Sequence, residues 1–241
     1  MPRSPVSFVL PLVALLLSAP APALAGSSDV QERLQTIERA WEGTRNYCGT
    51  FLLAIYGKKN AGMSTGTTCW DRSGWIRTET DSPFGPVIEI RGDKEVWYHD
   101  PARPVVIHLK ASADMDIETR QVGKGLGEVV DMLLQARDVQ SMPDTELGGR
   151  DAWAFTFERG SQGVVVFVDA EHKLPVALEL RNAQDKPALS YGLVEFRHNP
   201  DLPPESFTIE SPEGYPVVDL TFDPNQEAPA DAAKRSGAGS P

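Results

Sequence analysis

The sequence predicts a mainly β (α+β) fold, a strongly curved antiparallel sheet of about ten strands with helices against one face. Short segments in which polar and apolar residues alternate recur between residues 47 and 222, separated by Gly, Pro and Asp. Only two stretches have apolar residues at helical spacing instead. Strands and helices do not alternate regularly, which argues against a parallel α/β sheet.

Residues 1–25 have the pattern of a cleaved export signal. Arg3 is followed by an apolar run over residues 6–17, and residues 23–25 read Ala-Leu-Ala, a small-x-small cleavage site. An uncleaved membrane anchor is the alternative, but the run is shorter than the ~20 residues that span a bilayer. Cleavage after Ala25 predicts a periplasmic protein, in a compartment without nucleotide. The residue directly after the cut is not Cys, so we do not expect the mature chain to be a lipoprotein.

The composition excludes several classes of partner and site. The chain carries 23 basic and 34 acidic residues, a formal net charge of −11, and has no Lys/Arg cluster. We therefore expect no nucleic-acid partner. Cys48 and Cys69 are the only cysteines, so a zinc knuckle and a haem-attachment motif are excluded and a disulfide is expected in an exported protein.

The first predicted element is an amphipathic helix that begins at Ser28 and ends near Gly43. Its apolar residues recur every three to four positions, with charged residues on the other faces. We expect this stripe to pack on the core; it consists of Val30, Leu34, Ile37 and Trp41.

A long β-hairpin follows, with strands over residues 47–56 and 64–72. In a hairpin, paired residues have nearly constant index sums, and pairing Cys48 with Cys69 centres the turn on Lys58 and Lys59. The two cysteines then face each other and can form a cross-strand disulfide. We expect a structural staple rather than a redox pair, which is more often Cys-x-x-Cys.

The same register predicts one apolar face on this hairpin. Side chains alternate along a strand, so this face excludes the cysteines and carries one cation. Its members are Tyr47, Phe51, Leu53, Ile55, Trp70 and Arg72.

Further strands and one helical insertion complete the predicted domain, which spans residues 26–223. The insertion lies within 113–140, and residues 224–241 are predicted to be a disordered tail because they lack apolar periodicity. The other predicted strands are 74–79, 87–91, 95–99, 105–110, 152–158, 164–169, 177–181, 190–197 and 217–222.

No catalytic group or cofactor site is predicted. His99 and His108 lie on adjacent strands, and with Asp100 or Asp93 they could ligate a metal, but solvated turn residues explain them better. Ser161 lies between glycines in a hairpin turn rather than in a nucleophile elbow. We therefore expect a protein that is not an enzyme, has no cofactor and binds no metal.

Two segments resemble the periplasmic outer-membrane lipoprotein carriers, the LolA-like superfamily. Residues 88–101 read IEIRGDKEVWYHDP, and residues 196–214 read FRHNPDLPPESFTIESPEG. With the opening helix and hairpin they follow the order of that family over about residues 28–222. The resemblance implies an unclosed antiparallel half-barrel with a helical lid on its concave face. It also implies that Arg72 acts as a latch to the lid. Ser73 and Gly74 stand where the family has Pro, and the family lacks the cysteine pair, so the resemblance is to a divergent member.

Two functions follow as hypotheses. The first is a monomeric carrier that shelters acyl chains of lipids or lipoproteins during outer-membrane lipoprotein sorting and exchanges them with envelope membrane proteins. The alternative is a non-catalytic regulatory or scaffolding module of the envelope that binds a partner protein through strand edges. The predicted acyl-binding residues are Phe51, Leu53, Ile55, Trp70, Arg72, Trp97, Leu126, Val130 and Leu133.

Overall fold

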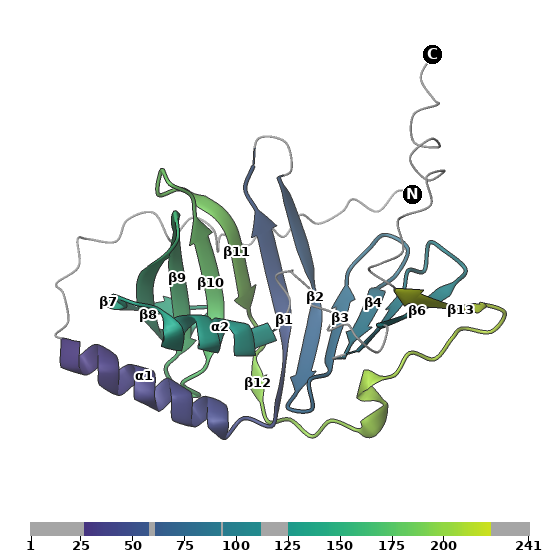
Figure 1. Cartoon of the computed structure of the whole chain (residues 1–241), viewed down its shortest axis with the longest axis horizontal. Coiled ribbons are helices and arrows are strands. Elements are labelled where there is room, and N and C mark those ends of the chain that lie inside the picture. The colour runs from purple at the N-terminus through teal and green to yellow at the C-terminus, as the bar shows by residue number, and fades with distance from the viewer. Residues whose placement is uncertain (1–26, 58–60, 93, 112–124, 223–241) are drawn as a thin grey trace, which may run out of the picture. The chain divides into compact units, whose positions relative to one another are not determined.

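The computed structural model describes residues 27–57, 61–92, 94–111 and 125–222 (Figure 1). The predicted export signal and C-terminal tail lie outside these residues. The elements are α1 (Ser27–Glu42), β1 (Asn46–Ile55), β2 (Gly62–Asp71), β3 (Ile76–Thr80), β4 (Val87–Arg91), β5 (Glu95–His99), β6 (Val106–Ala111), α2 (Gly125–Gln135), β7 (Gln140–Leu147), β8 (Arg150–Arg159), β9 (Gln162–Asp169), β10 (Pro175–Arg181), β11 (Pro187–Leu193), β12 (Arg197–His198), the 3₁₀ helix η2 (Pro204–Phe207) and β13 (Val217–Phe222).

The predicted fold class is confirmed: the chain is mainly β, and its sheet does not close on itself. The strand order is β13-β6-β5-β4-β3-β2-β1-β11-β10-β9-β8-β7, with the short β12 paired to β1. The pairings for which a register is defined are antiparallel except one, because β13 runs parallel to β6. The described residues form thirteen strands rather than the expected ten or so.

Strand β7 is the longest of the elements that the sequence pattern missed, which also include β12 and η2. Its pairing with β8 shifts register between Met142 and Thr145. Pro143 and Asp144 lie inside that shift and break the alternation by which a strand is recognised. Proline has no backbone N–H to donate to a neighbouring strand, so within sheets it is found at edge strands and bulges. Because β7 is the last strand of the order, it meets both conditions.

The described residues form two compact units. The helical unit comprises residues 27–43, 52–57, 61–63 and 126–194. The disulfide unit comprises residues 44–51, 64–92, 94–111, 125 and 195–222.

The core of the helical unit lies between its two helices and β8–β10. Figure 1 shows α1 and α2 running across these strands. The helical periodicity predicted for α1 is confirmed, since its apolar stripe is buried here. Burying a Leu, Val or Phe side chain contributes about 1.5–3 kcal/mol. The buried members are Val30, Leu34, Ile37, Val129, Val130, Leu133, Phe155, Phe157, Val164, Val166, Val168 and Leu178.

Trp153 of β8 contacts two cations, Arg33 of α1 and Lys173 of the turn between β9 and β10. The guanidinium carbon of Arg33 lies 5.0 Å from the indole centroid, and the Lys173 ammonium lies 4.2 Å from it. Arg33 also donates to Asp144 at 2.6 Å, and this hydrogen bond raises the pKa of Arg33 above its ordinary value. The helix is thereby tied to β7 and β8 outside the apolar core.

The turn between β9 and β10 is held by a buried carboxylate. Asp169 is 1% exposed and accepts the backbone N–H of Glu171 at 3.0 Å and of His172 at 2.7 Å. Arg150 lies 3.3 Å from its other oxygen. Burial alone would raise the pKa of Asp169, but the hydrogen bonds from His172 and the charge of Arg150 outweigh it and lower this pKa below 3.8.

The substitution Asp169→Asn is expected to lower the free energy of unfolding by about 1–2 kcal/mol at pH 7, because the amide keeps an acceptor but loses the charge. The pKa of Asp169 is lower in the folded state. The charge therefore stabilises fully above the unfolded-state pKa near 3.8, and this contribution is lost as pH falls through the folded-state pKa. Urea denaturation of both proteins between pH 7 and 2.5 should show their difference shrink below about pH 4.

Asp185→Asn is the control, because that carboxylate is 81% exposed where it pairs with Arg181. It should change stability by less than about 0.5 kcal/mol. A difference between wild type and Asp169→Asn that stays constant over the whole pH range would contradict the role given to the charge.

Neither described helix has the length and apolar character that crossing a membrane requires.

Candidate functional site

The strand registers define one face of the sheet in the disulfide unit, which we call the Trp70 face. Residues directly opposite each other on neighbouring strands point to the same side. Two rows of side chains therefore cross this face. One is Trp70, Ile76, Arg91, Val96, Leu109 and Leu220, and the other is Thr68, Thr78, Glu89, Tyr98, Ile107 and Val218.

On the β1 side, the Trp70 face consists of aromatic rings that pack on neighbouring groups. Tyr47 is 1% exposed and stacks on Trp70 with ring centroids 5.5 Å apart. The Phe51 ring lies over Gly66, where an added Cβ would come within 2.9 Å of it. These contacts confirm that Tyr47, Phe51 and Trp70 share one face, as the index sum predicted.

Towards β13 the same face is open. Ile76, Val96, Tyr98, Ile107 and Leu109 are only half-buried. Val218 and Leu220 at the end of the rows are 39% and 46% exposed. Apolar side chains thus remain partly in water on β3, β5, β6 and β13. Covering such a surface with an apolar partner is favourable.

One charged pair lies within the two rows. Glu89 and Arg91, two residues apart on β4, form an ion pair with each other. The Arg91 Nε atom is buried and has no hydrogen-bond partner among the described residues. A buried N–H without a partner costs about 1–3 kcal/mol, so this atom favours a guest that brings an oxygen acceptor.

Trp97 does not lie with Trp70. It pairs with Ile90 on one side and with His108 on the other, whereas the Trp70 row runs through Val96. Trp97 therefore points to the opposite face, which carries Cys69 and Arg77 and which we call the disulfide face. Trp97 was predicted to contact acyl chains together with Trp70, whereas the half-buried members of β5 on the Trp70 face are Val96 and Tyr98.

His108 has its ring nitrogens occupied on the disulfide face. The ring stacks on Trp97 with centroids 3.6 Å apart. Its Nδ1 lies 2.9 Å from Asp219 and its Nε2 lies 2.6 Å from Glu95. Within the described residues no group of His, Cys, Asp and Glu side chains is arranged to hold a metal ion. His99, the other candidate ligand, is buried near Tyr215 instead.

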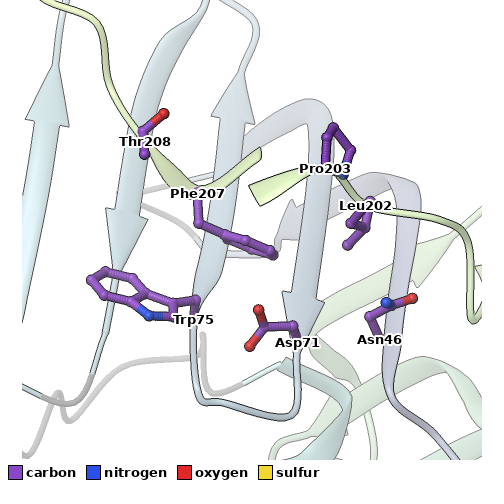
Figure 2. A pocket seen from close by; sticks show the side chains of 7 residues that line it. All are labelled: Asn46, Asp71, Trp75, Leu202, Pro203, Phe207 and Thr208. Carbon is purple, nitrogen blue, oxygen red and sulfur yellow. The ribbon is translucent and has the colours of Figure 1, made fainter. Parts of the chain in front are cut away.

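The disulfide face also carries a pocket of about 370 Å³. Figure 2 shows its walls, which come from the start of β1, the end of β2, the residue before β3 and the segment around η2. The lining residues are Asn46, Asp71, Trp75, Leu202, Pro203, Phe207 and Thr208.

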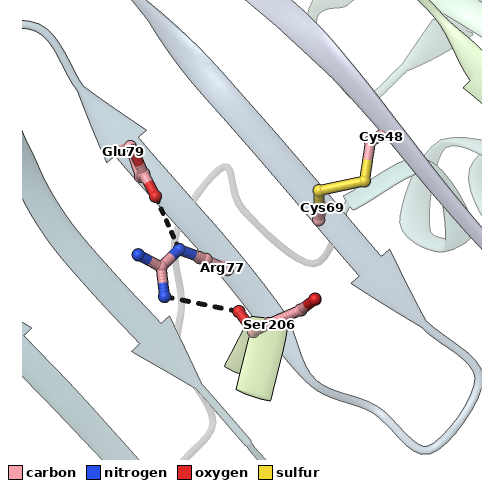
Figure 3. The surroundings of a disulfide bond; sticks show 5 residues. All are labelled: Cys48, Cys69, Arg77, Glu79 and Ser206. Carbon is pink, nitrogen blue, oxygen red and sulfur yellow. Dashed lines mark hydrogen bonds and ion pairs between the residues drawn. A yellow bond between two sulfur atoms is a disulfide. The ribbon is translucent and has the colours of Figure 1, made fainter. Parts of the chain in front are cut away.

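Next to this pocket, the C-terminal segment is held on the disulfide face by Arg77 (Figure 3). The guanidinium donates to the carbonyl oxygens of Ser206 at 3.3 Å and Thr208 at 2.9 Å, and its Nε donates to Glu79 at 2.7 Å. The predicted disulfide joins Cys48 and Cys69 on this face, with Cα atoms 4.1 Å apart.

The other predicted site residues have varied surroundings. Leu53 is half-buried and Ile55 is 43% exposed. Arg72 is exposed, and its backbone N–H donates to the Arg45 carbonyl. Three residues of α2 are buried in the helical unit: Leu126 is 3% exposed, and Val130 and Leu133 are 0% exposed.

Of the residues in the two rows, only Trp70 was predicted from the sequence, and the missed members include four residues of β5 and β6. Val96 and Tyr98 alternate with Trp97, and Ile107 and Leu109 alternate with His108. The index-sum argument could have been extended from the first hairpin through β3 and β4. It would have placed these residues with Trp70, because the register of each strand pair decides which side chains of the next strand point to the same face.

No protein-family model and no curated protein sequence matches the chain. Solved structures match it by fold. An uncharacterized conserved protein from Thermus thermophilus superposes with a TM-score of 0.53 at 13% identity, over 80% of this chain and 99% of that one. LprF from Mycobacterium bovis superposes with a TM-score of 0.50 at 8% identity, over 76% of this chain and 97% of that one.

MucB is a third structure of similar fold, with a TM-score of 0.51 at 14% identity over 77% of this chain. The match spans 64% of the length of MucB. The chain thus shares the fold of these three structures, at 8–14% sequence identity.

Proposed function

We propose that the chain is an exported envelope protein that binds acyl chains of lipids or lipoproteins on the Trp70 face. The observation that carries the proposal is the pair of rows that leaves apolar side chains half-covered from β3 to β13. Each methylene of a guest buried there contributes about 0.8 kcal/mol, so affinity would come from area.

The Glu89–Arg91 pair favours a ligand that combines a hydrocarbon chain with a hydrogen-bond acceptor. An acyl ester brings a carbonyl oxygen as well as a hydrocarbon chain. That oxygen would accept from the buried Arg91 Nε, which has no partner in the described part of the chain. A plain hydrocarbon would leave this donor unsatisfied and bind less tightly.

Export to the periplasm is part of the proposal. The disulfide between Cys48 and Cys69 is typical of an oxidising compartment. An acyl carrier there would shelter its cargo between membranes and exchange it with envelope membrane proteins. In this proposal Arg72 is the latch, and Leu126, Val130 and Leu133 contact cargo only after α2 leaves its place in the core of the helical unit.

The test compares two exposed apolar residues on the same strand. Leu220 is 46% exposed on the Trp70 face, and Val217, opposite Val106, is 45% exposed on the other face. Leu220→Gln is expected to weaken binding of a dansylated fatty acid about 5- to 10-fold, because the amide replaces apolar contact area. Val217→Gln is the matched control and should leave the dissociation constant within about twofold.

Native mass spectrometry of the purified wild-type protein completes the experiment. Retained lipid supports lipid carriage if Leu220→Gln also weakens fatty-acid binding and Val217→Gln does not. The proposal fails if no lipid is retained and the fatty acid does not bind, or if the two variants lose affinity equally.

A second candidate function, binding of a partner protein, is favoured by the position of β13. This strand is the last in the order, and Val217, Val218 and Leu220 are exposed on it. Strand edges with apolar side chains accept a further strand from a partner. A photo-cross-linking residue at position 217 distinguishes the functions: adducts to a protein that persist with excess fatty acid favour the partner.

A further inference from the structure

The pocket on the disulfide face has the chemistry of a cation site. Asp71 is the one charged side chain among its lining residues, which include two aromatic rings and three apolar or small residues. Its volume of about 370 Å³ is in the range of small-molecule sites.

Hydrogen-bond acceptors are in excess around this pocket. Asp71 Oδ1 accepts the backbone N–H and the hydroxyl of Ser73 at 2.8 and 2.5 Å, which fixes the carboxylate in a tight turn. Figure 2 shows this carboxylate pointing towards the Phe207 ring. The side-chain oxygen of Asn46 is buried and has no hydrogen-bond partner within the ranges that the structure describes. A half-turn of this amide exchanges its oxygen and nitrogen, so Asn46 can present an acceptor to the pocket.

The two aromatic side chains are held in place by their neighbours. The Trp75 indole lies over Gly92, where an added Cβ would come within 2.9 Å of the ring. Phe207 ends η2, which Arg77 fixes to the sheet through the carbonyls of Ser206 and Thr208. Ring faces beside a carboxylate attract organic cations, with about 0.5–2 kcal/mol from each ring.

We propose that this pocket binds a primary ammonium group at the end of a short aliphatic chain, as in a lysine side chain or a small diamine. A primary ammonium has three N–H donors, which match the acceptors of Asp71 and Asn46, whereas a quaternary ammonium has none. Leu202 and Pro203 cover the aliphatic stem. The site is independent of the proposed acyl surface, because it lies on the opposite face of the same strands.

The experiment uses the full chain and three probes. The indole N–H resonance of Trp75, identified with Trp75→Phe, is followed during titration with Nα-acetyl-lysine amide, with cadaverine and with Nα-acetyl-norleucine amide. Norleucine has an aliphatic chain without the ammonium. Both amines are expected to shift the resonance saturably with millimolar or tighter affinity, and norleucine amide is expected to leave it unchanged. Tighter binding of acetyl-lysine amide indicates a protein side chain as the source, and tighter binding of cadaverine indicates a free diamine.

Asp71→Asn is the decisive variant, since the amide can still accept from Ser73 but carries no charge. It should weaken binding of acetyl-lysine amide at least 10-fold. Asp81→Asn removes an exposed carboxylate of the same unit that does not line the pocket, and it should leave the affinity unchanged. Raising the salt concentration from 0.02 to 0.5 M should weaken binding to the wild type about 3- to 10-fold, which tests the charge without any substitution.

Three results would overturn the proposal. One is the absence of a saturable shift of the Trp75 resonance with either amine. Another is equal binding of the lysine and norleucine amides, which would indicate an apolar pocket. The third is an affinity that neither Asp71→Asn nor salt changes.

Discussion

Replacing Leu133 by alanine is expected to lower the free energy of unfolding by about 2–5 kcal/mol. Leu133 is 0% exposed and lies in the cluster that joins α2 to Ile37 of α1 and to Phe155 and Val166 of the sheet. Removing three carbon atoms leaves a cavity that rigid neighbours on three elements cannot fill. Urea denaturation followed by circular dichroism measures the loss.

Leu134→Ala is the matched control for this change. Leu134 follows Leu133 on the same helix, but it is only partly buried at the margin of the cluster. The identical chemical change there should cost clearly less, about 1 kcal/mol. Equal losses at the two positions, or a loss below 1 kcal/mol at Leu133, would mean that α2 is not fixed in the core as described.

The double substitution Cys48→Ala/Cys69→Ala is expected to cost about 3 kcal/mol. The disulfide joins residues 21 positions apart, and closing a loop of that length removes conformational entropy from the unfolded chain. Chemical denaturation of the oxidised wild type and the variant gives the difference. Mass spectrometry under non-reducing conditions verifies that the wild type is oxidised.

Reduction provides the control without any substitution. Dithiothreitol should destabilise the wild type by about the same amount and leave the variant unchanged, because only the wild type holds a bond to break. Since Cys48 is 1% exposed, reduction should be slow until the protein opens. A loss below 1 kcal/mol in both experiments would argue that the hairpin is held by its strand pairing alone.

Local pairing was predictable from the sequence because a hairpin is set by a few adjacent residues. The index sum of Cys48 and Cys69 correctly predicted both the disulfide and the face shared by Tyr47 and Trp70. The helical spacing of Val30, Leu34 and Ile37 predicted the buried stripe of α1, because burial follows periodicity when a helix has one apolar side.

The candidate site was only partly predictable. Trp97 was predicted to lie with Trp70, but the side to which it points depends on the register of β2 with β3, of β3 with β4 and of β4 with β5. The helical pattern of α2 does not reveal whether the helix is a lid or part of the core, since both have the same apolar stripe. The pocket beside Asp71 depends on η2, which lies more than a hundred residues away in the chain. Contacts at that separation leave no periodic signal.

Strand β13, from the C-terminal part of the chain, pairs with the much earlier strand β6, and this long separation affects the order in which the strands pair. Strands β7 to β11 follow one another in sequence and pair as successive hairpins, except that β11 also meets β1. The disulfide unit, in contrast, joins His108 to Asp219 across 111 positions. Pairing of distant segments requires closing a long loop, which costs conformational entropy and is slow. We therefore expect β13 to be the last strand of this unit to pair. Until it docks, the His108 ring lacks its contact with Asp219, and the formation of that contact marks the last step of folding.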